Sequence, residues 1–394
     1  MAVRSPARPW LAAAAALVLA AGLAGCGSDT ADAPQETAPP EPAAPQWFVA
    51  PSGSDIGAGT REDPFATMAA AHAVAADGDI VEMAGGDYPV QRWSEPSAGP
   101  GEPVVFVPAP GAVVRLAYLQ LDDVDDVEFR DLRTEGWYIG PGSQRVTLQG
   151  VRSSVNGNFI TSARDVLIQG GEIGPVDSSD GIQVKVAEGG VQPARITIDG
   201  VRMHDITRRE DPDSHVDCVQ FGAGRDVVVR RSRFDRCATQ GVFLRPFGGG
   251  VIEDVLIENN WFGLVIEGFS GLVVDEDVGP GAGIVVRYNS SVAGMRVEPA
   301  GARMTANVGP LQSFACVPGV VYRHNVWSEA SCDPTDQTAA LGFADPSGPD
   351  PVLVPGAAAI DAGDPADHPD TDIDGRTRPM GSAPDAGASE AAPG

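Results

Sequence analysis

Short apolar segments recur along the middle of the chain, and each alternates apolar and polar positions before it ends at a small or polar residue such as Gly or Asn. A period of two is typical of a strand with one buried face. No stretch of helical periodicity separates the segments, which start 19 to 36 residues apart. They begin at Val127, Val146, Val166, Ile196, Val227, Val255, Ile284 and Val320.

This repeat predicts an all-β fold, a right-handed parallel β-helix. The lack of intervening helices excludes βαβ crossovers, a β-propeller needs longer and more regular blades, and a β-sandwich would not repeat one motif eight times. In a solenoid, coils stacked about 4.8 Å apart bury one side of each strand in a continuous interior. Variable loops are expected at the corners, where Gly- and Asp-rich insertions separate some repeats.

Both ends of the repeat region are suited to cap it, because a solenoid exposes unpaired strand edges at its terminal coils. The stretch 63–79 places Met68, Ala71 and Ala75 on one helical face, so we expect a short N-terminal capping helix. The segment 47–88 resembles the N-terminal cap of bacterial secreted right-handed parallel β-helix proteins, the pectate-lyase-like superfamily, and the tail 358–390 resembles their C-terminal segment. The resemblance implies the fold and leaves the activity open, since the superfamily holds lyases, hydrolases, epimerases and inert scaffolds.

The beginning of the chain has the pattern of a secretory signal. Arginines precede an apolar run at 10–23, which is too short to span a membrane, and the run leads into Leu-Ala-Gly and Cys26. This string resembles the bacterial lipobox, which implies a lipoprotein signal peptide at 1–25 and a lipid on Cys26. The alternative is an ordinary signal peptide with an incidental cysteine.

The expected organisation follows from these features. Residues 26–46 are rich in Pro, Ala and acid and read as a disordered tether. We expect the β-helix with its cap at 47–346 and a C-terminal capping segment and tail at 347–394. The protein is then an extracytoplasmic, membrane-anchored lipoprotein, and we expect a monomer.

The net charge is −27, with acids spread along the whole chain. This excludes nucleic acid as a partner and disfavours simple adhesion to anionic lipid. It also disfavours a polyanionic substrate unless bound cations bridge the two.

Four cysteines remain after Cys26, and outside the cytoplasm they can form two disulfides. Cys316 and Cys332 flank one apolar segment, and we expect them to pair. Cys218 and Cys237 lie in adjacent coils but are offset along the strands. Their pairing stays open, because it requires a corner of the coil between them.

Three neighbouring coils align without gaps: "SSDGIQVK" (178–185), "HVDCVQFG" (215–222) and "ATQGVFLR" (238–245). With the apolar positions facing inward, the polar positions between them face solvent. The alignment predicts three columns: Asp180 with Asp217 and Gln240, Gln183 with Gln220 and Phe243, and Lys185 with Gly222 and Arg245.

The second of these columns suits sugar binding, because sugars are held by planar polar groups and aromatic rings. Gln183, Gln220 and Phe243 are therefore the candidate substrate contacts. Asp180 and Asp217 cap turn amides at coil corners, bind a cation such as Ca²⁺, or take part in catalysis.

The candidate catalytic residues are Lys185, Arg245 and His215. Lys185 is the only lysine in the chain, and a lysine, unlike an arginine, can serve as a base when its surroundings lower its pKa. The alternatives for Lys185 are a contact to a substrate carboxylate and a solvated side chain on a loop. Arg245 is expected two coils away, across a side-chain-free gap at Gly222, where it would hold a sugar carboxylate. His215 titrates near neutrality beside this cluster, or is an incidental surface histidine.

The strings around Asp180 and Asp217 resemble those of the polygalacturonase family, whose acids form a hydrolytic pair. Val216 stands where the second acid of a doublet would be, so a glycoside hydrolase is the less favoured interpretation.

Two hypotheses remain. The first is a polysaccharide lyase or epimerase for an acidic glycan, in which β-elimination needs a neutralised carboxylate and a base for the C5 proton. The resemblance implies Ca²⁺ or cationic residues for the first task. The alternative is a non-catalytic glycan-binding or structural protein of the cell surface.

Overall fold

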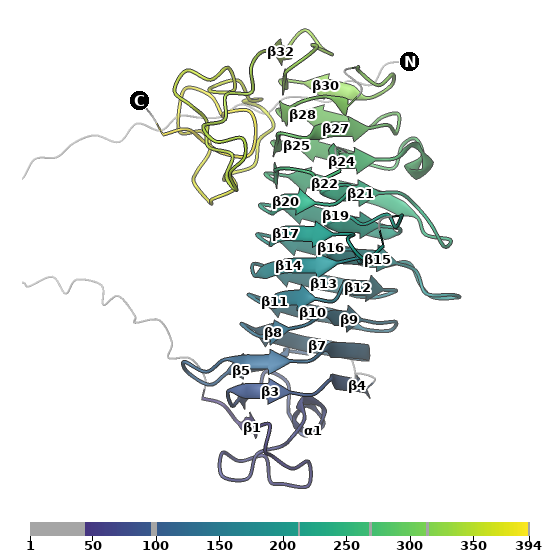
Figure 1. The fold of residues 1–394 in the computed structure, drawn as a ribbon, viewed down its shortest axis with the longest axis vertical. Coiled ribbons are helices and arrows are strands. Elements are labelled where there is room, and N and C mark those ends of the chain that lie inside the picture. Colours follow the sequence, from purple (N-terminus) through teal and green to yellow (C-terminus); the bar gives the residue numbers. More distant parts are fainter. Residues whose placement is uncertain (1–43, 96–100, 212, 268–269, 313–314, 393–394) are drawn as a thin grey trace, which may run out of the picture. The chain divides into compact units, whose positions relative to one another are not determined.

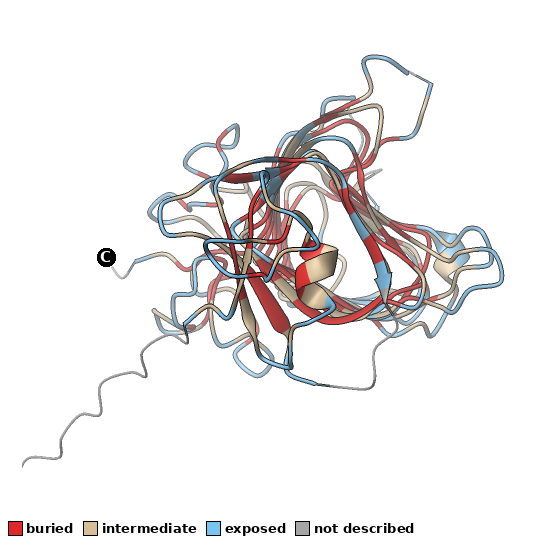
Figure 2. Cartoon of the chain, turned by 90° about the horizontal axis from the view of Figure 1, so that it is seen from below, coloured by how far each residue is buried: buried red, intermediate tan, exposed pale blue. Residues whose placement is uncertain are grey.

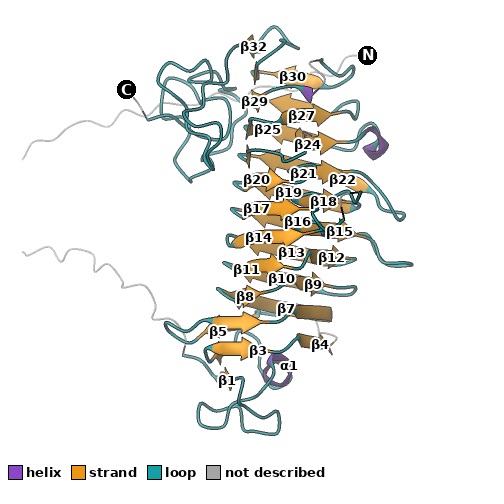
Figure 3. Ribbon diagram, viewed as in Figure 1, coloured by secondary structure: helices purple, strands orange, loops and turns teal. Residues whose placement is uncertain are grey.

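The computed structural model describes residues 44–95, 101–211, 213–267, 270–312 and 315–392. The expected signal peptide and the lipidation site Cys26 lie outside these residues. Within them, the chain is a right-handed parallel β-helix, as the repeat predicts, with strands stacked in sequence order (Figures 1 and 3). Most coils contribute one strand to each of three parallel sheets, here named A, B and C. No helix in the described ranges is long and apolar enough to cross a membrane.

Sheet A carries the apolar segments recognised in the sequence. Its strands are β1 (Trp47–Val49), β2 (Ile80–Met83), β5 (Val104–Pro108), the end of β7 (Leu119–Arg130), β10 (Gln144–Gln149), β13 (Arg164–Gln169), β16 (Ala194–Asp199), β19 (Gly224–Arg230), β22 (Ile252–Glu258), β25 (Ile284–Arg287), β28 (Arg303–Thr305) and β30 (Val321–Arg323).

Sheet B follows sheet A in each coil and is made of shorter strands. They are β3 (Gly86–Tyr88), β6 (Val114–Leu116), β8 (Arg133–Thr134), β11 (Arg152–Val155), β14 (Glu172–Asp177), β17 (Arg202–Thr207), β20 (Arg233–Cys237), β23 (Trp261–Phe262), β26 (Ser290–Ser291), β29 (Val308–Gly309), β31 (Val326–Trp327) and β32 (Gln337–Thr338).

Sheet C closes each coil before the chain returns to sheet A. Its strands are β4 (Gln91–Glu95), the start of β7, β9 (Trp137–Ile139), β12 (Asn158–Thr161), β15 (Ile182–Lys185), β18 (Val219–Phe221), β21 (Val242–Leu244), β24 (Ser270–Val274) and β27 (Gly294–Val297).

The inward side chains of the three sheets form the continuous core that the alternating pattern predicts. Figure 2 looks into the coils and shows buried residues around the interior, with exposed residues in the outer loops. Burying one aliphatic side chain contributes about 1.5–3 kcal/mol, and each coil repeats this several times. The inner column of sheet C, at most 1% exposed throughout, consists of Leu121, Ile139, Ile160, Val184, Phe221, Leu244, Val274 and Val297.

A further coil lies within the longest spacing between the repeats. Between the segments at Ile284 and Val320 lies β28, which pairs with β25 on one side and β30 on the other. Its segment reads Arg-Met-Thr, so only Met304 marks the buried position. One apolar residue is too weak a signal to show a strand in the sequence.

A stack of buried asparagines stabilises the corner after sheet A in the later coils. The side-chain oxygen of Asn289 accepts the backbone N–H of Asn260 at 3.0 Å, and that of Asn307 accepts the N–H of Asn289 at 3.1 Å. Asn325 and Asp336 continue the stack. Because the backbone turns away from the sheet here, these side chains provide hydrogen bonds that buried N–H groups need.

The N-terminal cap contains the expected helix, although it is short. Helix α1 spans Met68–His72, and Thr67 caps it by accepting the N–H of Ala70. Met68 and Ala71 are fully buried against the first coils. The helix therefore covers the apolar end of the solenoid.

The C-terminal segment packs on the outside of the later coils instead of continuing the strands. Arg378 has a fully buried side chain, which pairs with Glu390 at 2.7 Å and lies 4.8 Å from the ring centre of Tyr288. Its other terminal nitrogen donates to Asn259, which precedes the asparagine stack. Breaking such a buried pair is costly, so this contact fixes the segment to the coils.

Candidate functional site

A continuous column of polar and aromatic side chains follows the outer face of sheet C. The strand register places one member in each of six successive coils. All but the last are partly exposed, since their neighbours on each strand point into the core. We call this column the sheet C ladder; its members are Gln120, Tyr138, Phe159, Gln183, Gln220 and Phe243.

The structure thus brings together the three substrate contacts expected from the sequence, Gln183, Gln220 and Phe243. The other three members lie in earlier coils, outside the three coils that align without gaps. A signal for them exists, since Tyr138 and Phe159 each stand one position before a fully buried isoleucine, as Gln183 stands before a buried valine.

Lys185 lies beside the middle of the ladder, next to Phe159 and Gln183. Its Nζ donates to Oε1 of Gln183 at 2.8 Å and lies 5.0 Å from the ring centre of Phe159. Among the described residues it forms no ion pair with a carboxylate. A hollow of about 360 Å³ opens at this point, lined by Tyr118, Gln120, Asp122, Tyr138, Phe159 and Lys185.

Arg245 does not face Lys185 across an open gap, which corrects the expectation from the sequence. The ring of Phe247 fills the space at Gly222, where an added Cβ would lie 2.2 Å from a ring carbon. Arg245 is directed to Asp277, with 3.2 Å between Nε and Oδ2. Phe247 belongs to the loop after β21, whereas Asp277 belongs to the short 3-10 helix Glu276–Val278 after β24, and an alignment of columns takes neither loop into account.

Asp180 and Asp217 stack as aligned, but at a buried corner and not on the exposed face. Asp180 is 5% exposed and Asp217 is fully buried. Oδ1 of Asp180 accepts the backbone N–H of Asp217 at 2.8 Å, and Oδ1 of Asp217 accepts the N–H of Gln240 at 2.9 Å. Each acid therefore caps the turn of the next coil.

The same carboxylates contact the functional side chains around them. Oδ2 of Asp180 accepts from the amide of Gln183 at 2.9 Å, which links it to the ladder. Oδ2 of Asp217 lies 3.1 Å from Nδ1 of His215, whose ring centre lies 5.0 Å from that of Phe243. His215, Asp217 and Phe243 therefore form one cluster.

Burial and charge shift the protonation of this cluster. Burial, together with the nearby charge of Asp217, raises the pKa of Asp180 to about 7. The hydrogen bond to Asp217 raises the pKa of His215, and the charge of Asp180 adds to this effect. Asp180 consequently titrates near neutrality and His215 above the usual range of a histidine, so the cluster carries groups suited to acid–base chemistry.

The two acids do not fit a Ca²⁺ site. Ca²⁺ takes six to eight oxygen ligands, and the carboxylate oxygens here are directed to backbone N–H groups, Gln183, the hydroxyl of Thr239 and His215. In the part of the chain that the structure describes, no group of three His, Cys, Asp or Glu side chains could hold a metal ion.

Both cysteine pairs form disulfides. Cys316 is bonded to Cys332, and Cys218 is bonded to Cys237 with 5.3 Å between their Cα atoms. The second bond is possible because the corner between sheets B and C separates Cys237 from the strand that follows it. It ties the backbone next to Asp217 to the end of β20.

No protein-family model matches this sequence, and no curated protein matches it. Among solved structures, XylC in complex with xylose is similar over 88% of this chain and 98% of its own, with 10% identity and a TM-score of 0.50. The pectate lyase Pel9A is similar over 88% and 96%, with 15% identity and a TM-score of 0.49. A rhamnogalacturonan lyase is similar over 76% and 90%, with 14% identity and a TM-score of 0.37. At these identities the likeness concerns the fold alone.

Proposed function

We propose that the sheet C ladder binds an acidic polysaccharide and that the protein cleaves this glycan by β-elimination. The observation that carries the proposal is the ladder itself, in which three amides and three aromatic rings occupy six successive coils, beside an ammonium group that forms no ion pair with any described carboxylate. At about 4.8 Å per coil, six members extend over roughly 24 Å. Such a row suits a chain of several sugar units better than a single small molecule.

The ladder divides into two kinds of contact. Tyr138 and Phe159 offer ring faces on which a sugar can stack, while Gln183 and Gln220 offer amide groups for its hydroxyls. Gln183 donates to Gln220 at 2.9 Å, so the two amides hold each other in fixed orientations. Fixed side chains lose little entropy when a ligand binds.

Lys185 favours an acidic glycan. Its ammonium group lies at the edge of the aromatic hollow with a neutral amide as its hydrogen-bond acceptor, and a ligand carboxylate would give it an opposite charge. We assign Lys185 to a sugar carboxylate. This contact would also explain how a chain of net charge −27 holds a polyanion at one place.

A non-catalytic glycan-binding protein is the second candidate. The pairing of Arg245 with Asp277 favours it, because this cation is then less free to neutralise a uronate carboxylate. A screen separates the two: polymers of uronic acids, with a neutral glucan as control, are tested for binding and for the ultraviolet absorbance of an unsaturated product. We expect binding and absorbance with at least one uronate polymer. Binding without absorbance supports the second candidate, and no binding to any polymer contradicts both.

The location of this activity is also a proposal. We propose that the lipid on Cys26 anchors the protein outside the cytoplasm, with residues 27–46 as a tether. Fatty-acid labelling that is equal in the parent and in Cys26→Ala would contradict it.

A further inference from the structure

The corner between sheets B and C places a histidine next to a buried carboxylate. His215 directs Nδ1 to Oδ2 of Asp217 at 3.1 Å. The imidazole side chain is 43% exposed, whereas the carboxylate is completely buried. Among the described residues, Nε2 of this ring has no hydrogen-bond partner, so it is available to a ligand.

Asp217 cannot easily turn away from the histidine. Its other oxygen accepts the hydroxyl of Thr239 at 2.5 Å and the backbone N–H of Gln240 at 2.9 Å. The next residue, Cys218, is bonded to Cys237, which ends the strand leading to Thr239. With its acceptor fixed in this way, the neutral imidazole carries its proton on Nδ1 and leaves the lone pair of Nε2 free.

A ring and a cation lie near the histidine. The ring of Phe243, the last member of the ladder, is 5.0 Å away between centres. Arg208 donates to the carbonyl of Ser214, which directly precedes His215, and its charge acts on the imidazole.

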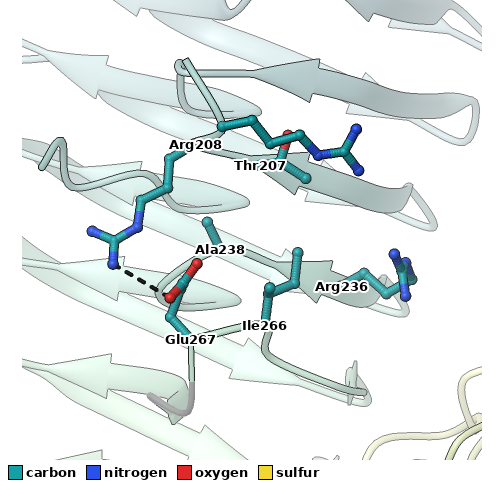
Figure 4. A pocket seen from close by; sticks show the side chains of 7 residues that line it. Thr207, Arg208, Arg236, Ala238, Ile266 and Glu267 are labelled. Carbon is teal, nitrogen blue, oxygen red and sulfur yellow. Dashed lines mark ion pairs between the residues drawn. The ribbon is translucent and has the colours of Figure 1, made fainter. Parts of the chain in front are cut away.

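The guanidinium of Arg208 also borders a hollow of about 300 Å³. Figure 4 shows it facing Glu267 across this hollow, with Arg236 further along. The distance from Arg208 to Glu267 is 3.6 Å, longer than a hydrogen bond, so donors of the guanidinium stay available for an anion.

From this arrangement we infer that His215 is the catalytic base of the β-elimination, that Asp217 is its positioning residue and that Arg208 holds the carboxylate of the sugar being cleaved. The inference rests on the proposed function and names its chemical step. Lys185 lies on β15, two coils before the strand of Phe243. The two residues are roughly 10 Å apart along the axis, so Lys185 contacts a different sugar unit.

The step needs no group besides water. Nε2 takes the C5 proton, the C5–H electron pair forms the C4=C5 double bond, and the C4–O bond breaks with its electrons on oxygen. That oxygen takes a proton from water, and the imidazolium returns its proton to the hydroxide that remains. Arg208 stabilises the negative charge that develops on the carboxylate.

The charged groups around the imidazole agree with this role. Asp217 and Asp180 raise the pKa of His215, whereas burial and Arg208 lower it, and the net shift is upward. The neutral imidazole is the base, so turnover should increase as the pH rises through this raised pKa.

The test uses the full-length protein with the uronate polymer that the screen identifies. His215→Gln should lower turnover a hundredfold or more, the usual loss on removing a general base, and should leave polymer affinity within about threefold. Asp217→Asn should lower turnover and move the rising limb of the pH profile to lower pH. His204→Gln is the control, because this histidine lies on the outside of sheet B between Asp205 and Glu172.

The outcomes separate the inference from the proposed function. Turnover by His215→Gln equal to that of the parent overturns the inference and leaves the function standing. Binding by the parent without unsaturated product overturns the inference and the lyase activity, but not the glycan binding. Absence of binding to every polymer overturns all three.

Discussion

The amide of Gln183 joins two residues that lie on different sides of the sheet C surface. Its Nε2 donates to the buried carboxylate of Asp180 at 2.9 Å, and its Oε1 accepts from the partly exposed ammonium of Lys185 at 2.8 Å. An amide can satisfy both neighbours in only one orientation. The protonation of Asp180 therefore affects how the ladder presents Lys185.

The raised pKa of Asp180 predicts a pH-dependent stability. The folded protein keeps this proton up to about pH 7, whereas an aspartic acid in the unfolded chain loses it near pH 4. The folded state binds more protons in this window, so the contribution of Asp180 to the free energy of unfolding falls as the pH rises through it, by at most about 4 kcal/mol.

Asp180→Asn should flatten this slope, measured by urea unfolding between pH 4 and 8. Asp345→Asn is the control, because a hydroxyl and backbone N–H groups lower the pKa of that exposed carboxyl and it titrates below the window. A slope in Asp180→Asn as steep as in the parent would contradict the assignment.

Lys185 should contribute charge to binding. Lys185→Ala should weaken affinity for the uronate polymer about tenfold, which corresponds to the loss of one charge-assisted hydrogen bond of about 1.4 kcal/mol. Lys185→Arg should stay within about threefold of the parent, and added salt should weaken the parent more than Lys185→Ala. Arg225→Ala removes a cation that pairs with Glu253 on sheet A and should change nothing. Unchanged affinity in Lys185→Ala would show that this ammonium does not contact the glycan.

The disulfide next to Asp217 should stabilise both the fold and the histidine. It connects residues 19 apart, so replacing Cys218 and Cys237 by Ala should cost about 3 kcal/mol in unfolding experiments. Turnover should also fall, since Asp217 is then less firmly held. The matched control replaces Cys316 and Cys332, which are 16 residues apart, and should lose similar stability while turnover is retained. Equal turnover in both double variants would argue against the positioning role of this corner.

The solenoid can be predicted from the sequence because the alternation of buried and exposed positions that forms it is periodic. Alternation such as that around Val146 and Leu148 recurs in most coils and needs no long-range information. The alternation cannot be recognised at β28, where Met304 is the only apolar residue of the strand.

The candidate site could be predicted only where strand register determines it. The columns of Gln183 and Asp180 follow from alignment of neighbouring coils and are present. The burial of Asp217, the ring of Phe247 over Gly222 and the turn of Arg245 to Asp277 depend on loops and corners. These have no period, so the sequence alone gave no means of placing them.

The most direct test of glycan binding along the ladder removes its two stacking rings. Affinity for the uronate polymer is measured by calorimetry in Tyr138→Ala/Phe159→Ala, with Phe48→Ala as control, because Phe48 lies in the N-terminal cap under Arg61. Circular dichroism first verifies that all proteins are folded. If each ring contributes roughly 1 kcal/mol, the double variant should bind about thirtyfold more weakly, while the control binds like the parent. Parent-like affinity in the folded double variant would contradict the account.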